Sequence, residues 1–104
     1  MAATPEAKVK ASIKKILQRY GVYYAMPIGS GYGNSGTPDF LCCVPGGIFL
    51  AIEAKAGKGR TTALQDKHLE AIKLCGGYAM VVNETGLLEL DEMLARMTDG
   101  EGTC

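Results

Sequence analysis

Apolar residues recur along the first twenty positions of the chain with the spacing of one helix face. The residues on this face are Val9, Ile13, Ile16, Leu17 and Tyr20. Thr4 and Pro5 precede them with the side chains that favour an N-cap and a first helical position, and Gly21 is a helix-ending residue. The pattern therefore predicts an amphipathic helix that begins at Thr4 and ends before Gly21.

Later segments are rich in apolar and β-branched residues without helical spacing, which is typical of strands. They are Asp39–Val44, Ile48–Ala54 and Tyr78–Val82, and Val22–Ala25 is a shorter fourth candidate. Only Pro45-Gly46-Gly47 separates the first two, so we expect them to form an antiparallel hairpin. We expect Tyr78–Val82 to be a buried strand.

Two further segments have helical spacing. The first begins at the N-cap Thr62, with Gln65 three residues later as in a capping box, and runs to Cys75. The second covers Leu87–Met97, and the tail Thr98–Cys104 is predicted to be frayed and flexible. Because a helix separates the last two strands, those strands can pair in parallel. The order of elements favours an α/β fold in which helices flank a mixed β-sheet.

Length and composition indicate one folded domain over residues 1–104. With 104 residues, 47% of them hydrophobic and 21% charged, the chain can bury a single core, and this composition argues against disorder. No apolar run is long enough to cross a bilayer, and the charged N-terminus is unlike a signal peptide. We therefore expect a cytoplasmic protein without a membrane partner. The cysteine spacing predicts no zinc site.

The formal net charge is zero, but the charges are unevenly distributed. The first twenty residues hold five basic residues and one acidic residue, whereas the segment from Asp91 onward holds four acidic residues and one basic residue. Lys14 and Lys15 belong to the basic helix and are candidates for contact with a polyanion. The alternative is that these lysines only form a solvated helix surface.

The segment Pro27–Gly36 is a loop by composition. Within it Gly31, Gly33 and Gly36 match the dinucleotide-binding fingerprint GxGxxG. That fingerprint follows a strand and opens a helix, whereas here the chain continues into the strand-like run from Asp39. We therefore expect no nucleotide cofactor at this loop.

Two carboxylates are expected side by side at one end of the predicted hairpin. If the turn has three residues, Val44 faces Ile48. By the same count Asp39 lies opposite Glu53, with Cβ atoms about 5 Å apart. Such carboxylates repel each other when both are ionised unless a cation lies between them, and Mg²⁺ is bound in this way.

Lys55 lies two positions after Glu53 and therefore projects from the same face of the strand. Beside a bound ion, its ammonium group could contact a scissile phosphate and stabilise charge that grows in the transition state. The alternative is an ion pair of Lys55 with Glu53 or Asp39 at the strand end, which would contribute little stability. Both interpretations stay open on these residues alone.

The stretch Gly36-Thr37-Pro38-Asp39, followed after a gap of thirteen residues by Glu53-Ala54-Lys55, resembles the PD-(D/E)xK nuclease signature. The early acidic residue Glu6, the glycine-rich loop and Gln65 make the arrangement similar to the virus-type replication-repair nuclease (VRR-NUC) branch. The resemblance extends from Glu6 to Val82 and implies a restriction-endonuclease-like core.

The resemblance also implies roles for these residues. Asp39 and Glu53 would bind Mg²⁺ or Mn²⁺ with help from the backbone carbonyl of Ala54. Lys55 would position or activate the attacking water, and Glu6 would be an accessory acid that reaches the site from the first helix.

Gln65 would orient Lys55 or the phosphate group. Simpler explanations exist for two of the implied residues, since Glu6 is a first-turn acid that suits the helix dipole and Gln65 completes a capping box. His68, the single histidine, is expected to be a surface or helix-packing residue rather than a general base.

The implied activity is metal-dependent endonucleolytic cleavage of DNA in repair, by a homodimer that cuts four-way (Holliday) junctions. Two symmetric active sites would suit a two-fold symmetric junction. Lys58 and Arg60 follow the motif directly and are expected to contact phosphate groups. The alternatives are a flap-type or non-specific DNA endonuclease with the same site, and a DNA-binding or interaction module that keeps the fold without turnover.

Overall fold

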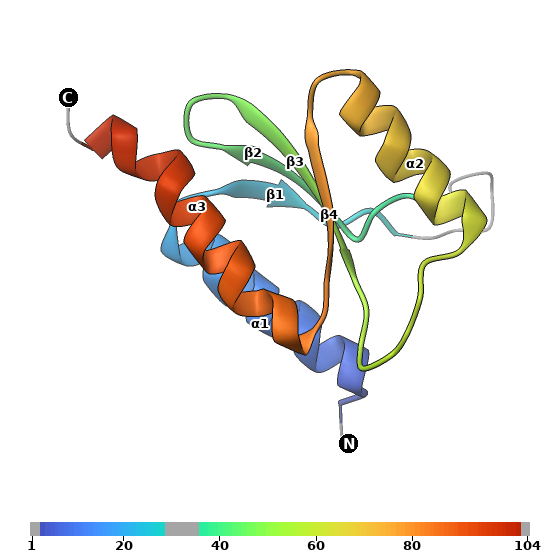
Figure 1. The fold of residues 1–104 in the computed structure, drawn as a ribbon. Helices are drawn as coiled ribbons and strands as arrows, with labels where there is room; N and C mark the ends of the chain where they lie inside the picture. Colours follow the sequence, from blue (N-terminus) through green and yellow to red (C-terminus); the bar gives the residue numbers. More distant parts are fainter. Residues whose placement is uncertain (1–2, 29–35, 103–104) are drawn as a thin grey trace.

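Four strands form one mixed sheet with helices on both of its faces (Figure 1). The computed structural model describes residues 3–28 and 36–102, and the side chains of these ranges as far as residue 99. The helices are α1 (Pro5–Arg19), α2 (Ala63–Leu74) and α3 (Leu87–Gly102), with a 3₁₀ turn η1 (Glu84–Gly86) before α3. The strands are β1 (Tyr23–Ala25), β2 (Phe40–Val44), β3 (Ile48–Ala54) and β4 (Tyr78–Val82).

The strands lie in the order β1-β2-β3-β4, in which β2 is antiparallel to both β1 and β3. Strand β4 is parallel to β3, and α2 connects the two. The predicted mixed α/β fold, the hairpin and the helical crossover are therefore confirmed.

The register of the hairpin is the predicted one. Val44 pairs with Ile48, and Phe40 pairs with Ile52 at the other end of the ladder. The connecting turn requires Gly47, whose φ of 84° is a conformation that residues with a Cβ rarely adopt. Because the ladder keeps one register throughout, the residues just beyond its open end also face each other.

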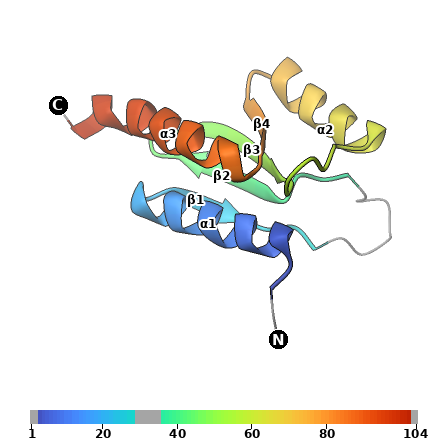
Figure 2. The same ribbon diagram turned by 60° about the horizontal axis from the view of Figure 1, so that its bottom comes forward.

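Helices α1 and α3 lie side by side on one face of the sheet, and α2 lies on the other (Figure 2). The two paired helices are joined by Asp91, which accepts a hydrogen bond from the Tyr20 hydroxyl at 2.6 Å and forms an ion pair with Arg19. The main core fills the space between these helices and the sheet. Its fully or almost fully buried members include Val9, Ile13, Leu17, Phe40, Val44, Leu50, Ile52, Val82, Leu90 and Leu94.

The structure corrects two predictions about single elements. Strand β4 is not buried along its length, because it is the edge strand, and Tyr78 and Val81 remain 52% and 45% exposed. Helix α3 does not end at Met97 but continues to Gly102, through most of the segment predicted to be frayed. The Thr98 hydroxyl donates to the Leu94 carbonyl at 2.8 Å, so this side chain forms a hydrogen bond with the backbone of its own helix.

Gly31 and Gly33 of the glycine-rich loop lie outside the described residues. Among the helices within the described ranges, none is both long enough and apolar enough to cross a membrane.

Candidate active site

Asp39 and Glu53 meet at the open end of the β2–β3 hairpin. Glu53 is the penultimate residue of β3 and is only 2% exposed, whereas Asp39 directly precedes β2 and is partly buried. The Asp39 Oδ2 atom accepts a hydrogen bond from the backbone N–H of Ala54 at 2.9 Å. The structure thus brings together the two carboxylates and the Ala54 backbone that the sequence suggested.

Glu53 points toward α2 rather than into the main core. Its neighbours Ile52 and Ala54 belong to the buried cluster under α1 and α3, so the alternation of a strand turns Glu53 to the opposite face. There it meets the first turn of α2. A buried carboxylate therefore lies between the sheet and the beginning of this helix.

The surroundings of Glu53 raise the pKa of its carboxyl group from 4.5 to about 7. Burial is the largest cause, since it disfavours the charged form, and the nearby Asp39 charge acts in the same direction. Lys55 opposes both effects. Near neutral pH, Glu53 is therefore divided between its protonated and ionised forms.

Lys55 lies directly against Glu53. Its Nζ atom is 3.6 Å from Glu53 Oε2, and only 15% of its side chain is exposed. The Lys55 N–H donates to the Val82 carbonyl at 3.0 Å, which extends the pairing of β3 with β4 by one residue. The hydrogen bond fixes the backbone that carries this lysine.

Gln65 forms the predicted capping box and also binds the Glu53 carboxylate. Its Oε1 atom accepts from the Thr62 N–H at 2.9 Å, and its own N–H donates to Thr62 Oγ at 3.1 Å, which completes the predicted capping box. Its Nε2 atom donates to Glu53 Oε2 at 2.9 Å. The resemblance had implied an interaction with Lys55 or phosphate, whereas this amide binds the carboxylate and joins it to the helix cap.

Glu6 is connected to the site through a residue that sequence reasoning had not singled out. The Nζ atom of Lys10 lies 3.6 Å from Glu6 Oε2 and 3.5 Å from Asp39 Oδ1. Lys10 is four residues after Glu6, a spacing that predicts their ion pair. The contact with Asp39 depends on how α1 packs beside the hairpin, and no local pattern reveals it.

Each carboxylate keeps one oxygen atom without a neutral hydrogen-bond donor. Asp39 Oδ2 is bound to the Ala54 N–H and Glu53 Oε2 to Gln65, which leaves Asp39 Oδ1 beside Lys10. Glu53 Oε1 is buried and has no hydrogen-bond partner among the residues that the structure describes. An unpartnered buried carboxylate oxygen is costly, and a cation is the ligand that such an oxygen accepts.

The residues present fit a hard divalent ion. Among the side chains that the structure describes, in residues 3–28 and 36–99, no group of three or more His, Cys, Asp or Glu residues could hold a metal. Mg²⁺, however, needs only one or two protein carboxylates and completes its coordination with other oxygen atoms and water. Asp39 and Glu53 would supply the carboxylates, and the backbone carbonyl of Ala54 would be a further oxygen ligand.

The segment after Lys55 is attached to the turn before α3. Glu84 Oε1 accepts from the Gly57 N–H at 2.8 Å, and this hydrogen bond is the main reason why the pKa of Glu84 is lowered. Asn83 also donates to the Gly57 carbonyl at 3.4 Å. The attachment holds the segment that presents Lys58 and Arg60, which are both exposed.

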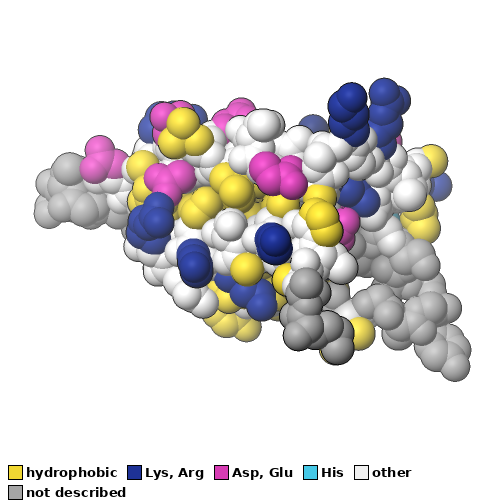
Figure 3. Space-filling model, turned by 90° about the horizontal axis from the view of Figure 1, so that it is seen from below, with side chains coloured by type: hydrophobic (Ala, Val, Ile, Leu, Met, Phe, Trp, Pro, Cys, Tyr) yellow, Lys and Arg dark blue, Asp and Glu magenta, His cyan; other side chains and the backbone are white. Residues whose placement is uncertain are grey.

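Lys14 and Lys15 are exposed on α1, as predicted. In the view of Figure 3, basic side chains are spread over the face and acidic side chains lie between them. The basic residues in this view do not form one continuous patch.

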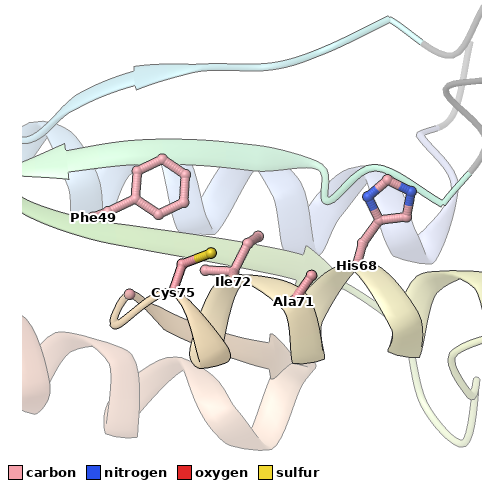
Figure 4. A pocket seen from close by; sticks show the side chains of 6 residues that line it. Phe49, His68, Ala71, Ile72 and Cys75 are labelled. Atoms are coloured by element: carbon pink, nitrogen blue, oxygen red, sulfur yellow. The ribbon is translucent and has the colours of Figure 1, made fainter.

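A separate cavity of about 290 Å³ lies between α2 and the sheet. It is lined by Phe49, His68, Ala71, Ile72, Cys75 and Gly77 (Figure 4). The lining is mostly apolar and includes neither of the two site carboxylates. His68 lies on α2 beside this cavity.

A mixed sheet whose central hairpin ends in an Asp and a Glu-Ala-Lys triplet defines the restriction-endonuclease-like class of folds. Comparison with solved structures places the chain more narrowly. It is similar to a structure described as a VRR_NUC domain, with a TM-score of 0.75 and 25% identity over 86% of this chain and 97% of that chain. No family model matches the sequence, and no curated protein matches it. The chain therefore has the VRR-NUC fold, which confirms the fold expected from the motif.

Proposed function

We propose that this chain is a divalent-metal-dependent endonuclease that hydrolyses the phosphodiester backbone of DNA. The observation that carries the proposal is the buried Glu53 carboxylate, which has an unpartnered Oε1 atom and lies beside Asp39. A buried carboxylate beside a second carboxylate contributes little stability, so this pair favours a role in binding a cation. The similarity to a VRR_NUC domain supports nuclease activity in particular.

The proposed roles follow from the contacts of each side chain. Asp39 and Glu53 would hold Mg²⁺ or Mn²⁺ with the Ala54 carbonyl, while Gln65 fixes the orientation of the Glu53 carboxylate. A bound divalent ion would supply Lewis acidity toward the phosphate and lower the pKa of a water molecule. The Lys55 ammonium would stabilise the negative charge that grows on the phosphate during attack.

The proposal of a particular DNA substrate rests on the resemblance of the motif to the VRR-NUC branch. We propose that the chain acts as a homodimer on branched DNA, with two sites that cut paired strands of a four-way junction. The exposed Lys58, Arg60, Lys14 and Lys15 would contact phosphate groups of the DNA. The alternative is a flap-type or non-specific DNA endonuclease, which would use the same site but would not need two sites related by two-fold symmetry.

The test is cleavage of end-labelled four-way junction, flap, single-stranded and linear duplex DNA with Mg²⁺, Mn²⁺ or EDTA. We expect metal-dependent, symmetric nicks across the junction for the wild type, and no cleavage by Asp39→Ala or Glu53→Ala. Glu92→Gln, which removes an exposed acid on α3, is the matched control and should retain activity. An active Asp39→Ala protein would refute the assignment of the site.

If no substrate is cut with either metal, a binding module becomes the better explanation. Thermal unfolding then separates the two cases, because a site that binds Mn²⁺ raises the melting temperature by mass action. A protein without the site should melt at the same temperature in Mn²⁺ and in EDTA.

A further inference from the structure

The ammonium group of Lys10 lies at the oxygen atom of Asp39 that a metal ion would need. Its Nζ atom is 3.5 Å from Asp39 Oδ1, while Asp39 Oδ2 is already bound to the Ala54 N–H. The Lys10 side chain is 32% exposed and that of Asp39 is 20% exposed, so water screens this pair only in part. A positive charge thus already lies beside the free oxygen.

The two lysines of the site are placed differently with respect to their acids. Lys55 lies against the Glu53 oxygen that also accepts from Gln65, which leaves the other Glu53 oxygen free. Lys10 lies against the free oxygen of Asp39 itself. A divalent cation that approaches Asp39 Oδ1 would therefore be repelled by Lys10, whereas the lysine beside Glu53 lies at the oxygen that Gln65 already holds.

Glu6 offers Lys10 a second acceptor on the same helix. The Glu6 Oε2 atom is 3.6 Å from Lys10 Nζ, and the two residues are separated by one helical turn. Lys10 therefore already bridges the two acids, and a small rotation of its flexible side chain away from Asp39 would leave it paired with Glu6 alone, without movement of α1 or the hairpin.

We propose that Lys10 is a positioning residue that acts as the internal counter-ion of Asp39 and passes to Glu6 when a divalent ion binds. The proposal rests on the metal site of the proposed function. It gives Glu6 a role different from the accessory acid that the resemblance implied, since Glu6 acts here through Lys10. Lys10 competes with the metal in this arrangement and sets the metal concentration at which the site fills.

The first experiment measures Mn²⁺ binding by isothermal titration calorimetry, without DNA, for the wild type, Lys10→Met and Lys8→Met. Because Lys10→Met removes the competing charge, this variant should bind Mn²⁺ about fivefold more tightly than the wild type, or better, as is typical of coupled sites. Lys8→Met removes the same charge from an exposed position of α1 and should bind like the wild type. Unchanged or weaker binding by Lys10→Met would overturn the proposal.

Failure of the metal site itself gives a different result. If the wild type binds no Mn²⁺, the proposed function and this inference fall together, whereas an unaltered affinity of Lys10→Met removes only the inference. Lys10→Gln repeats the measurement should the methionine variant fail to fold, since it also removes the charge and keeps a polar end.

A double-mutant cycle tests the transfer to Glu6. Glu6→Gln should weaken Mn²⁺ binding in the wild-type background, because Lys10 loses its second acceptor and stays on Asp39. In the Lys10→Met background the same substitution should have no effect. Weakened binding there as well would mean that Glu6 acts on the ion directly, and the transfer would be refuted.

Discussion

Replacement of Glu53 by glutamine tests the electrostatics of the site without any substrate. The buried carboxyl group has a pKa of about 7 in the folded protein and an ordinary value of 4.5. The folded protein therefore binds this proton more tightly than the unfolded chain does. The stabilising contribution of Glu53 is fully present below pH 4.5 and is lost as the pH rises through about 7.

The size of the effect follows from the difference between the two pKa values. A difference of one pKa unit corresponds to about 1.4 kcal/mol. Between pH 5 and pH 8, the ionisation of Glu53 should lower the free energy of unfolding of the wild type by about 2 to 3 kcal/mol. Glu53→Gln has no carboxyl group to ionise at this position. Between pH 5 and pH 8, its free energy of unfolding should therefore fall by about 2 to 3 kcal/mol less than that of the wild type.

The assay is urea unfolding at pH 5 and pH 8 in EDTA, with both proteins treated identically. Because the change between pH 5 and pH 8 is compared for the two proteins, any effect of the substitution on packing and hydrogen bonding that does not depend on pH cancels. Mg²⁺ should reduce the loss of wild-type stability at pH 8, because it binds the ionised carboxylate. Equal pH dependence of the two proteins in EDTA would refute the idea that Glu53 is a destabilised buried acid.

Three further predictions concern the residues around the two acids. Thr62→Ala should lower the free energy of unfolding by about 1 kcal/mol through loss of the helix cap, whereas Gln65→Ala should lower it further and also weaken Mn²⁺ binding; urea unfolding and calorimetry measure both. Lys55→Met should lose cleavage but retain DNA affinity in Ca²⁺, as measured by fluorescence anisotropy, and normal turnover would remove its catalytic role. Gly36→Ala should weaken Mn²⁺ binding, because a Cβ atom there would lie 2.7 Å from the side chain of Leu64, the neighbour of Gln65 in α2. Gly47→Ala is the control and should leave Mn²⁺ binding unchanged, because Gly47 also has a positive φ but a Cβ atom there would meet no atom of the described residues within 4 Å beyond its chain neighbours.

The part of the site on the hairpin could be predicted because it depends on local geometry. A three-residue turn and the two-residue period of strands are enough to bring Asp39 opposite Glu53 and to turn Lys55 to the same face. The capping box of Gln65 was also visible as a spacing. Its simultaneous bond to Glu53 was not, since the position of α2 over the sheet is set by packing.

Long-range packing also explains what the sequence did not reveal. Lys10 looked like any other basic residue of α1, because its contact with Asp39 joins parts of the chain that are 29 positions apart. The apolar residues of Tyr78–Val82 predicted burial, but the sheet ends at β4 and leaves part of that strand in solvent. Local periodicity identifies an element, whereas its neighbours determine how much of it is covered.

The placement of charges explains how a buried strand can lead into Glu-Ala-Lys without leaving its acids uncompensated. Lys55 lies within 4 Å of Glu53, and Lys10 lies within 4 Å of both Asp39 and Glu6, so each of the two site acids has an ammonium group beside it. The compensation is incomplete, because Glu53 Oε1 has no partner and the pKa of this group remains raised. A divalent ion would supply the missing positive charge at that oxygen. Because opposite charges attract more strongly in a buried environment, the burial that destabilises the metal-free carboxylate also increases the free energy gained when the ion binds.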